Sequence, residues 1–118
     1  MKLLNKEETI IKKSKFITYY YEIDHKDEVI TILNELKQEH KKAKHIPYAY
    51  VINNIAGKTD DKEPTGTAGL PILNILQKNN LNSNLIVIIR YFGGVKLGSS
   101  NLLRTYSNCA KEVIKKSL

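Results

Sequence analysis

The sequence predicts an α/β domain of the two-layer α+β kind, a mixed β-sheet with helices packed on one face. Three observations support this class. Apolar residues recur at helical spacing over about 26–43 and 99–116. The continuous apolar run LIVIIRY, residues 85–91, has the length of a strand and indicates a central one. The opening part of the chain is rich in β-branched and aromatic residues, which favour strands.

The first half of the chain predicts strands, a helix and a hairpin in turn. The stretch EETIIKKSKFITYYYEI, residues 7–23, predicts two short strands, or one bent strand, with the bend at 13–14. A helix follows over about 26–43, and Asp24 is placed to cap its N-terminus. The segment HIPYAYVIN predicts a strand, and the asparagines at 53–54 suit a tight turn into a second strand, IAGKTD.

The second half predicts a loop, a short helix, the central strand and a last helix. DDKEPTGTAGLP, residues 60–71, begins as a loop because it holds two prolines and two glycines. LPILNILQKN predicts a short helix that tolerates Pro71 in its first turn. Glycine-rich FGGVKLGSSN then leads into the helix at 99–116, whose apolar face carries Leu102, Leu103, Tyr106, Cys109, Ala110, Val113 and Ile114. The expected order is strand, strand, helix, strand, strand, helix, strand, helix.

Length and composition describe one globular domain in a reducing compartment. The 118 residues are too few to give two halves a core each, so we expect a single domain over 1–118. No apolar run approaches the ~20 residues that a membrane helix needs, and MKLLNKEET lacks the apolar core of a signal peptide. Cys109 is the only cysteine and cannot form an internal disulfide. These features predict a cytoplasmic protein without membrane association.

The net charge of +7 is concentrated in the second half of the chain. Up to Glu63, 12 basic residues stand against 11 acidic ones, whereas from Pro64 onward seven basic residues stand against Glu112 alone. Both arginines, Arg90 and Arg104, lie in this basic half. The asymmetry favours an anionic partner such as RNA or phosphate. Lysines used for solubility would give the same pattern.

Four segments carry a resemblance to a known family: KKSKFI (12–17), AKHIPYAYVI (43–52), DDKEPTGTAGLPIL (60–73) and IRYFGGVKLGSSNLLRTYS (89–107). In this order they resemble the N-terminal domain of the IMPACT/YigZ family. The resemblance runs along nearly the whole chain, and the DDKEPTGTAG string is far more specific than a lone glycine motif. Two positions depart from the family pattern. Lys62 replaces a glycine, and the Ser-Ser-Asn run at 99–101 stands where the family usually has small residues.

The resemblance implies a fold similar to the second domain of ribosomal protein S-five of the small subunit, which part of elongation factor G shares. It also implies a link to translation, because the eukaryotic member IMPACT regulates translation through protein contacts on a ribosome-linked stress-kinase pathway. Bacterial members usually carry a second, ferredoxin-like domain that is discussed as a nucleic-acid-binding element. We expect that C-terminal domain to be absent from these 118 residues.

The candidate ligand- or partner-binding residues lie in two loops and at the strand end between them. They are Asp60, Asp61, Glu63, Thr65, Gly66 and Thr67 in the first loop, Arg90 on the strand, and Gly93, Gly94, Lys96, Gly98 and Arg104 beyond it. Carboxylates suit Mg²⁺ or Ca²⁺, but these lack the alternating ladder of a calcium loop. We therefore expect them to cap backbone groups or to pair with the two arginines, with no metal site and no cofactor.

Both glycine-rich runs, TGTAG and GGVKLGSS, lead into a helix, whose open amides with Lys96 nearby suit a phosphate. Alternatively, the glycines only permit left-handed backbone in tight connections. The second run resembles the phosphate loop of small-molecule kinases of this fold family, yet 118 residues are too few to enclose ATP and a substrate. We expect His40 to pack on the apolar helix face and His45 to hydrogen-bond a loop. Without Ser-His-Asp spacing, a zinc pattern or a dinucleotide fingerprint, the sequence identifies no catalytic residue.

The polar side of the last helix carries Arg104, Lys111 and Lys115, and we expect the two lysines to contact nucleic acid. We also expect the loop acids, Arg90, Lys96 and Arg104 to share one cleft, because connections at one end of a sheet can meet. The sequence favours a non-enzymatic, translation-linked regulatory protein that contacts RNA or a ribosome-associated partner. Two alternatives stay open: an enzyme or sensor that binds a phosphate or nucleotide ligand in the glycine-rich loops, and a pure protein–protein interaction module.

Overall fold

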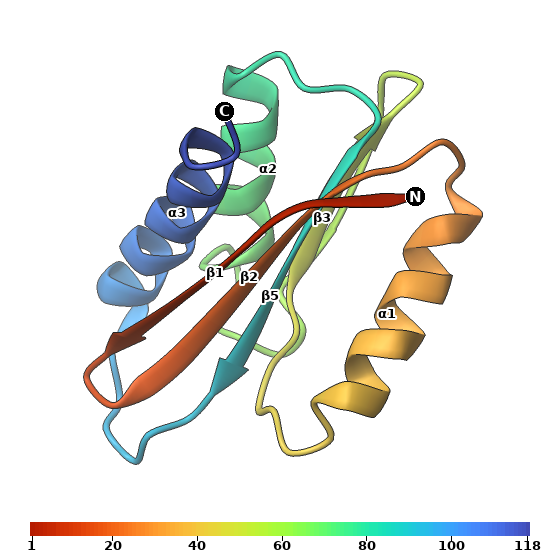
Figure 1. The fold of residues 1–118 in the computed structure, drawn as a ribbon. Coiled ribbons are helices and arrows are strands. Elements are labelled where there is room, and N and C mark those ends of the chain that lie inside the picture. Colours follow the sequence, from red (N-terminus) through yellow and green to blue (C-terminus); the bar gives the residue numbers. More distant parts are fainter.

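The computed structural model describes residues 1–118, and its elements follow the expected order (Figure 1). The strands are β1 (Lys2–Ile11), β2 (Ser14–Glu22), β3 (Tyr48–Ile52), β4 (Ile55–Thr59) and β5 (Asn84–Tyr91). The helices are α1 (Asp27–Glu39), α2 (Gly69–Lys78) and α3 (Ser99–Lys115). The predicted succession and the α+β class are confirmed. None of the three helices combines the length and the apolar character that a membrane crossing needs.

The five strands form one sheet in the order β1-β2-β5-β3-β4. Every neighbouring pair is antiparallel, whereas we expected a mixed sheet. The reason is that α1 connects β2 to β3 and α2 connects β4 to β5, each time across one intervening strand. A helical crossover returns the chain to a strand of the same direction. Because the two crossovers interleave, strands of opposite direction end up side by side.

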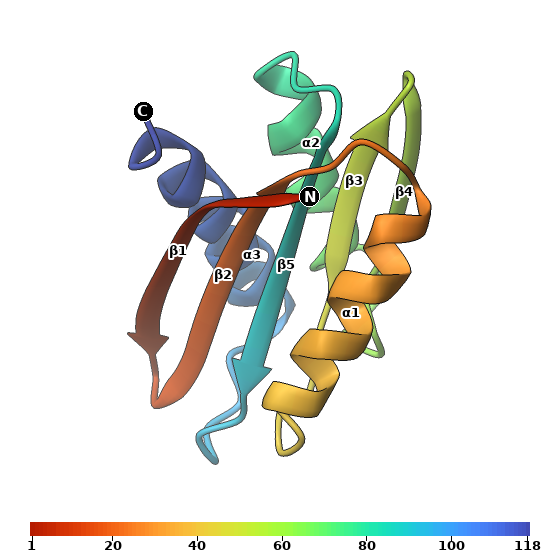
Figure 2. The same ribbon diagram turned by 45° about the vertical axis from the view of Figure 1, so that its right-hand side comes forward.

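Helices cover both faces of the sheet, where we expected them on one. Figures 1 and 2 show α2 and α3 on one face and α1 on the other. From β5, Ile86 and Ile88 join the core under α2 and α3, whereas Leu85, Val87 and Ile89 join the core under α1. The molecule therefore has three layers. Burial on both sides explains the continuous apolar run of β5 and confirms it as the central strand.

The opposite placement of α1 and α2 depends on the hands of the two crossovers. β2 and β4 run antiparallel, and the chain crosses the sheet from them in opposite directions. Two crossovers of the same hand would therefore place both helices on one face. Since the helices lie on opposite faces, one crossover departs from the right-handed rule that nearly all such connections follow. Sequence periodicity shows which side of a helix is buried, but not the hand of its connection.

The start and end of α1 also differ from expectation. Asp24 does not cap the helix; instead the Glu28 carboxylate accepts from the backbone N–H groups of Asp24 at 2.7 Å and His25 at 2.9 Å. The helix ends at Glu39, short of residue 43, because the backbone of His40 leaves the helical region with φ −116° and ψ 54°. Apolar spacing reports neither the polar contacts at the start of α1 nor the change of backbone conformation that ends it.

Four connections meet at one end of the sheet. β4 and β5 run in the same direction and finish there, while β2 and β3 run in the opposite direction and begin there. This arrangement gathers the turn at 12–13 and the connections at 40–47, 60–68 and 92–98. The expected convergence of the two glycine-rich loops thus follows from the strand directions.

The last helix packs as expected except at Leu103, which was assigned to the apolar face but is 47% exposed. One side of α3 is buried against the sheet through Leu102, Tyr106, Ala110 and Val113. Its opposite side, which carries Arg104, Lys111 and Lys115, is exposed.

Candidate functional site

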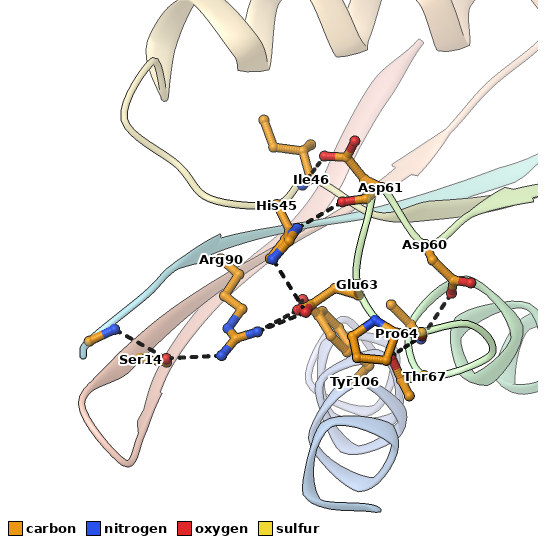
Figure 3. A network of polar contacts seen from close by, with 12 residues as sticks. Ser14, His45, Ile46, Asp60, Asp61, Glu63, Pro64, Thr67, Arg90 and Tyr106 are labelled. Atoms are coloured by element: carbon orange, nitrogen blue, oxygen red, sulfur yellow. Dashed lines mark hydrogen bonds and ion pairs between the residues drawn. The ribbon is translucent and has the colours of Figure 1, made fainter. Parts of the chain in front are cut away.

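The centre of the candidate site is Glu63, a buried carboxylate in the connection between β4 and α2 (Figure 3). Arg90, near the end of β5, donates from Nη1 to Oε1 at 2.9 Å and to Oε2 at 2.7 Å. The Tyr106 hydroxyl of α3 donates to Oε2 at 2.5 Å, and Nε2 of His45 lies 3.4 Å from Oε1. Burial and the neighbouring carboxylate raise the pKa of Tyr106, which keeps its hydroxyl protonated. The ion pair thus joins the 60–68 connection to β5, and the Tyr106 hydroxyl ties the same carboxylate to α3.

Arg90 lies between two phenyl rings. Its Cζ is 5.7 Å from the ring centroid of Phe16 and 5.8 Å from that of Phe92. Nη2 is 3.5 Å from Oγ of Ser14, which also accepts from the Gly93 N–H at 3.3 Å. The buried Nε has no partner in the chain. The guanidinium therefore makes its short hydrogen bonds only to Glu63, through Nη1.

Asp60 caps α2 from outside the helix. Its Oδ2 accepts from the Gly66 N–H at 3.0 Å, and its Oδ1 accepts from Ala68 at 3.1 Å and Gly69 at 2.8 Å. Burial acts to raise the pKa of Asp60, but the three backbone bonds outweigh it and hold the pKa below its usual range. The side chain is thus engaged by the chain itself.

Asp61 and His45 tie the same loop to the segment before β3. Oδ2 of Asp61 accepts from the Ile46 N–H at 2.6 Å, and its carbonyl lies 2.8 Å from Nδ1 of His45. A carbonyl can only accept, so Nδ1 of His45 carries the hydrogen. The expectation that His45 hydrogen-bonds a loop is confirmed. No group of three or more His, Cys, Asp or Glu side chains in the chain is arranged to hold a metal ion.

The small residues of the loops shape the backbone. Gly66, Gly94 and Gly98 have φ of 80°, 88° and 82°, in the left-handed region that glycine adopts without strain. Thr67 is buried and donates to a carbonyl three residues earlier at 2.6 Å, whereas Thr65 is exposed. These residues hold the loops in place.

A cavity of about 460 Å³ lies beside the network at the start of α3. Lys44, Arg90, Phe92 and Lys96 contribute to its wall. The backbone N–H groups of 99–101 have no hydrogen-bond partner in the chain, and the first turn of α3 carries no acidic residue. Cations and open donors therefore gather on one side of the network. A smaller cavity of about 220 Å³, between β1 and α3, contains none of the predicted site residues.

Three of the predicted contact residues lie outside the network. Arg104 donates from Nη1 to Oδ1 of Asn101 at 3.2 Å and contacts none of the loop acids. Together with Lys111 it borders a shallow depression on the exposed side of α3, and Lys115 follows one turn later. Of the groups expected to share one cleft, Glu63, Arg90 and Lys96 line the cavity, whereas Asp60, Asp61 and Arg104 do not.

Four residues that sequence reasoning did not include complete the site. Ser14 and Tyr106 hold the network, and Lys44 and Phe92 line the cavity. All four stand within the segments that carry the family resemblance, so those segments were the available signal. Their meeting depends on strand order, which residue spacing does not report.

Comparisons with known proteins place the chain among its relatives. The family model described as the Impact N-terminal domain matches residues 12–114. The IMPACT family member YvyE of Bacillus subtilis is 37% identical over 115 residues, covering 95% of this chain and 53% of that protein. The IMPACT family member YigZ of Escherichia coli is 32% identical over 110 residues, covering 89% and 54%. The chain spans about half the length of the curated relatives it matches.

Two solved structures share the fold. A crystal structure of a protein described as hypothetical superposes with a TM-score of 0.90 at 29% identity, covering 95% of this chain and 57% of the other. The structure of the two-domain translational regulator Yih1 superposes with a TM-score of 0.55 at 19% identity, covering 98% and 46%. With most of its length matched by the family model and by close relatives, the chain belongs to the IMPACT family through an Impact N-terminal domain.

Proposed function

We propose that this domain is a translation-linked binding module that contacts RNA through the exposed side of α3. The observation that carries the proposal is the row of Arg104, Lys111 and Lys115 on that side. None of the three forms an ion pair with a carboxylate of the chain. Unpaired cations on one exposed face are the feature that neutralises nucleic-acid phosphates.

The link to translation is supported by the relatives of the chain. Yih1, which shares the fold, is described as a two-domain translational regulator, and the chain corresponds to 46% of that structure. This description supports a translation-linked role for the domain as part of the proposal.

Binding without catalysis is supported by the state of the candidate acid–base groups. Glu63, His45 and Tyr106 are the groups most suited to proton transfer, and His45 and Tyr106 both contact Glu63 inside the network. The Glu63 side chain is only 2% exposed and is held by Arg90. A carboxylate engaged in this way is poorly placed to exchange protons with a substrate.

The test is the salt dependence of RNA binding, measured by fluorescence anisotropy with a labelled short single-stranded RNA. We expect log K to fall linearly with log salt concentration, with a slope of about −0.7 per phosphate contact. The double variant Lys111→Glu, Lys115→Glu should bind more weakly and show a slope that is smaller by about 1.4, from two lost contacts.

The matched control is Lys26→Glu, Lys37→Glu, which changes the net charge equally on the opposite face, where both side chains are exposed. Equal weakening by both double variants would show that only net charge matters and would remove the α3 face from the proposal. Absence of RNA binding even at low salt would instead favour the protein–protein interaction module.

A further inference from the structure

The cavity at the start of α3 offers a net positive wall to a small anion. Three cationic side chains, Lys44, Arg90 and Lys96, stand there against one carboxylate, Glu63. Arg90 donates twice to that carboxylate, so its charge is compensated within the network. The volume of about 460 Å³ falls within the ~300–1,000 Å³ of pockets that enclose small ligands. A ligand with a compact negative group matches this wall.

Two independent sets of hydrogen-bond donors in the same wall lack acceptors. The N–H groups of 99–101 open the 17-residue helix α3 without a side-chain cap, at the positive end of the helix dipole. Arg90 is 5% exposed, and its Nε finds no acceptor in the chain. A buried donor without a partner is rare in folded proteins, and the guanidinium that carries it forms part of the cavity wall. Both sets favour a phosphate group.

The cavity also carries an aromatic platform. Phe92 lines the cavity and is 47% exposed, whereas phenylalanine side chains are usually buried. The Arg90 guanidinium backs the ring at 5.8 Å from its centroid. An exposed ring beside phosphate-binding donors is the arrangement that stacks a nucleic-acid base.

We propose that this cavity binds a phosphorylated nucleotide, with the phosphate at Lys96 and the open amides of 99–101 and the base against Phe92. In an RNA the ligand is the 5′-phosphorylated end; the same chemistry is offered by a free nucleoside monophosphate. This inference deepens the proposed function and partly rests on it, because the RNA source requires that the α3 face binds RNA. It assigns recognition of the 5′ end of an RNA to a surface separate from Lys111 and Lys115.

The test compares two short single-stranded RNAs that differ only in a 5′-phosphate or a 5′-hydroxyl, by fluorescence anisotropy at low salt. We expect the phosphorylated RNA to bind about tenfold more tightly, as charge-assisted hydrogen bonds to phosphate allow. Lys96→Ala, at an exposed position, should remove this preference. Phe92→Leu keeps an apolar side chain without the ring and should weaken binding of the phosphorylated RNA about tenfold, the cost of a lost stacked base. The control Lys115→Ala lies outside the cavity and should weaken both RNAs equally.

A second measurement separates the two sources of the ligand. In NMR titrations, uridine monophosphate should shift the amide signals of 96–101, and uridine should not. If the RNAs bind with salt dependence but without a 5′ preference, and the nucleotide acts no differently from the nucleoside, the inference is wrong and the proposed function stands. If neither RNA binds but uridine monophosphate shifts these amides, the free nucleotide is the ligand and the proposed function is wrong.

Discussion

Glu63 is a charged side chain that is almost entirely buried, and its partners determine what each substitution costs. The carboxylate accepts from Arg90 and Tyr106 and faces His45. Removing one member of a buried ion pair leaves the other charge uncompensated, which typically costs ~3–5 kcal/mol. A lost hydroxyl donor costs less, ~1–3 kcal/mol, because the ion pair stays in place.

We therefore expect Arg90→Ala to lower the free energy of unfolding by ~3–5 kcal/mol and Tyr106→Phe by ~1–3 kcal/mol. The measurement is urea denaturation followed by circular dichroism. Arg104→Ala serves as the control, because Arg104 is exposed and a surface substitution of this kind changes stability by about 0.5 kcal/mol or less. Identical urea midpoints for Arg90→Ala and Arg104→Ala would show that the network does not stabilise the fold.

The two arginines also show how far residue patterns can be taken. Arg104 is offset from the buried positions Leu102 and Tyr106 of the same helix, so helical periodicity alone could have placed it in solvent. Arg90 ends an apolar run, which predicts burial and a need for a partner. The identity of that partner, Glu63, depends on which loops meet, and no local pattern reports it.

At the scale of elements, His40 fastens the end of α1 to the sheet. Its Nε2 lies 2.8 Å from the Tyr19 hydroxyl on β2, and its Nδ1 lies 2.6 Å from the Tyr91 hydroxyl on β5. A neutral imidazole has one donor and one acceptor, so one tyrosine donates to the ring and the other accepts from it. Burial lowers the pKa of His40, with Lys6 and Lys15 acting in the same direction and Glu39 against them. His40 is buried, as predicted, but it follows α1 as its C-cap instead of lying on the apolar face of the helix.

This lowered pKa predicts a pH dependence of stability. The unfolded chain takes up the proton near the ordinary value of ~6.5, whereas the folded chain takes it up only at lower pH. The neutral imidazole therefore makes its full contribution to the free energy of unfolding above about pH 6.5. This contribution is lost as the pH falls from there towards the pKa of His40 in the folded chain. Unfolding free energies measured between about pH 8 and pH 5 should fall more steeply for the native chain than for His40→Gln. If the free energies of unfolding of the two proteins changed in parallel with pH, stability would not be coupled to the protonation of His40.

Turns were the most predictable connections, and caps the least. Asn53 and Asn54 have φ of 51° and 62°, as the expected tight turn requires. The first hairpin turns at Lys12 and Lys13, with φ of 46° and 68°, one residue before the expected bend. The cap of α2 comes from Asp60, eight residues before its N-cap, a distance at which local capping rules do not apply.

The whole molecule is organised by two interleaved crossovers of opposite hand. They bury β5 from both sides and bring four connections to one end of the sheet, where the network and the cavity lie. Periodicity and turn residues predict the eight elements and the central strand, because these depend on neighbours in sequence. The strand directions and the second helical layer depend on how the elements are arranged in space, which local sequence patterns do not encode. The family resemblance supplied neither of these two features; the α+β class it implies is supported by the superposition at a TM-score of 0.90.

Recognition is expected on the α3 side of the molecule and not on the α1 face. The most direct test is an amide NMR map of the isotope-labelled domain titrated with short single-stranded RNA. We expect the signals of 96–104 and of Lys111 and Lys115 to shift in a salt-sensitive way, while those of α1 stay in place. Shifts concentrated on α1, or no shifts at low salt, would contradict the account.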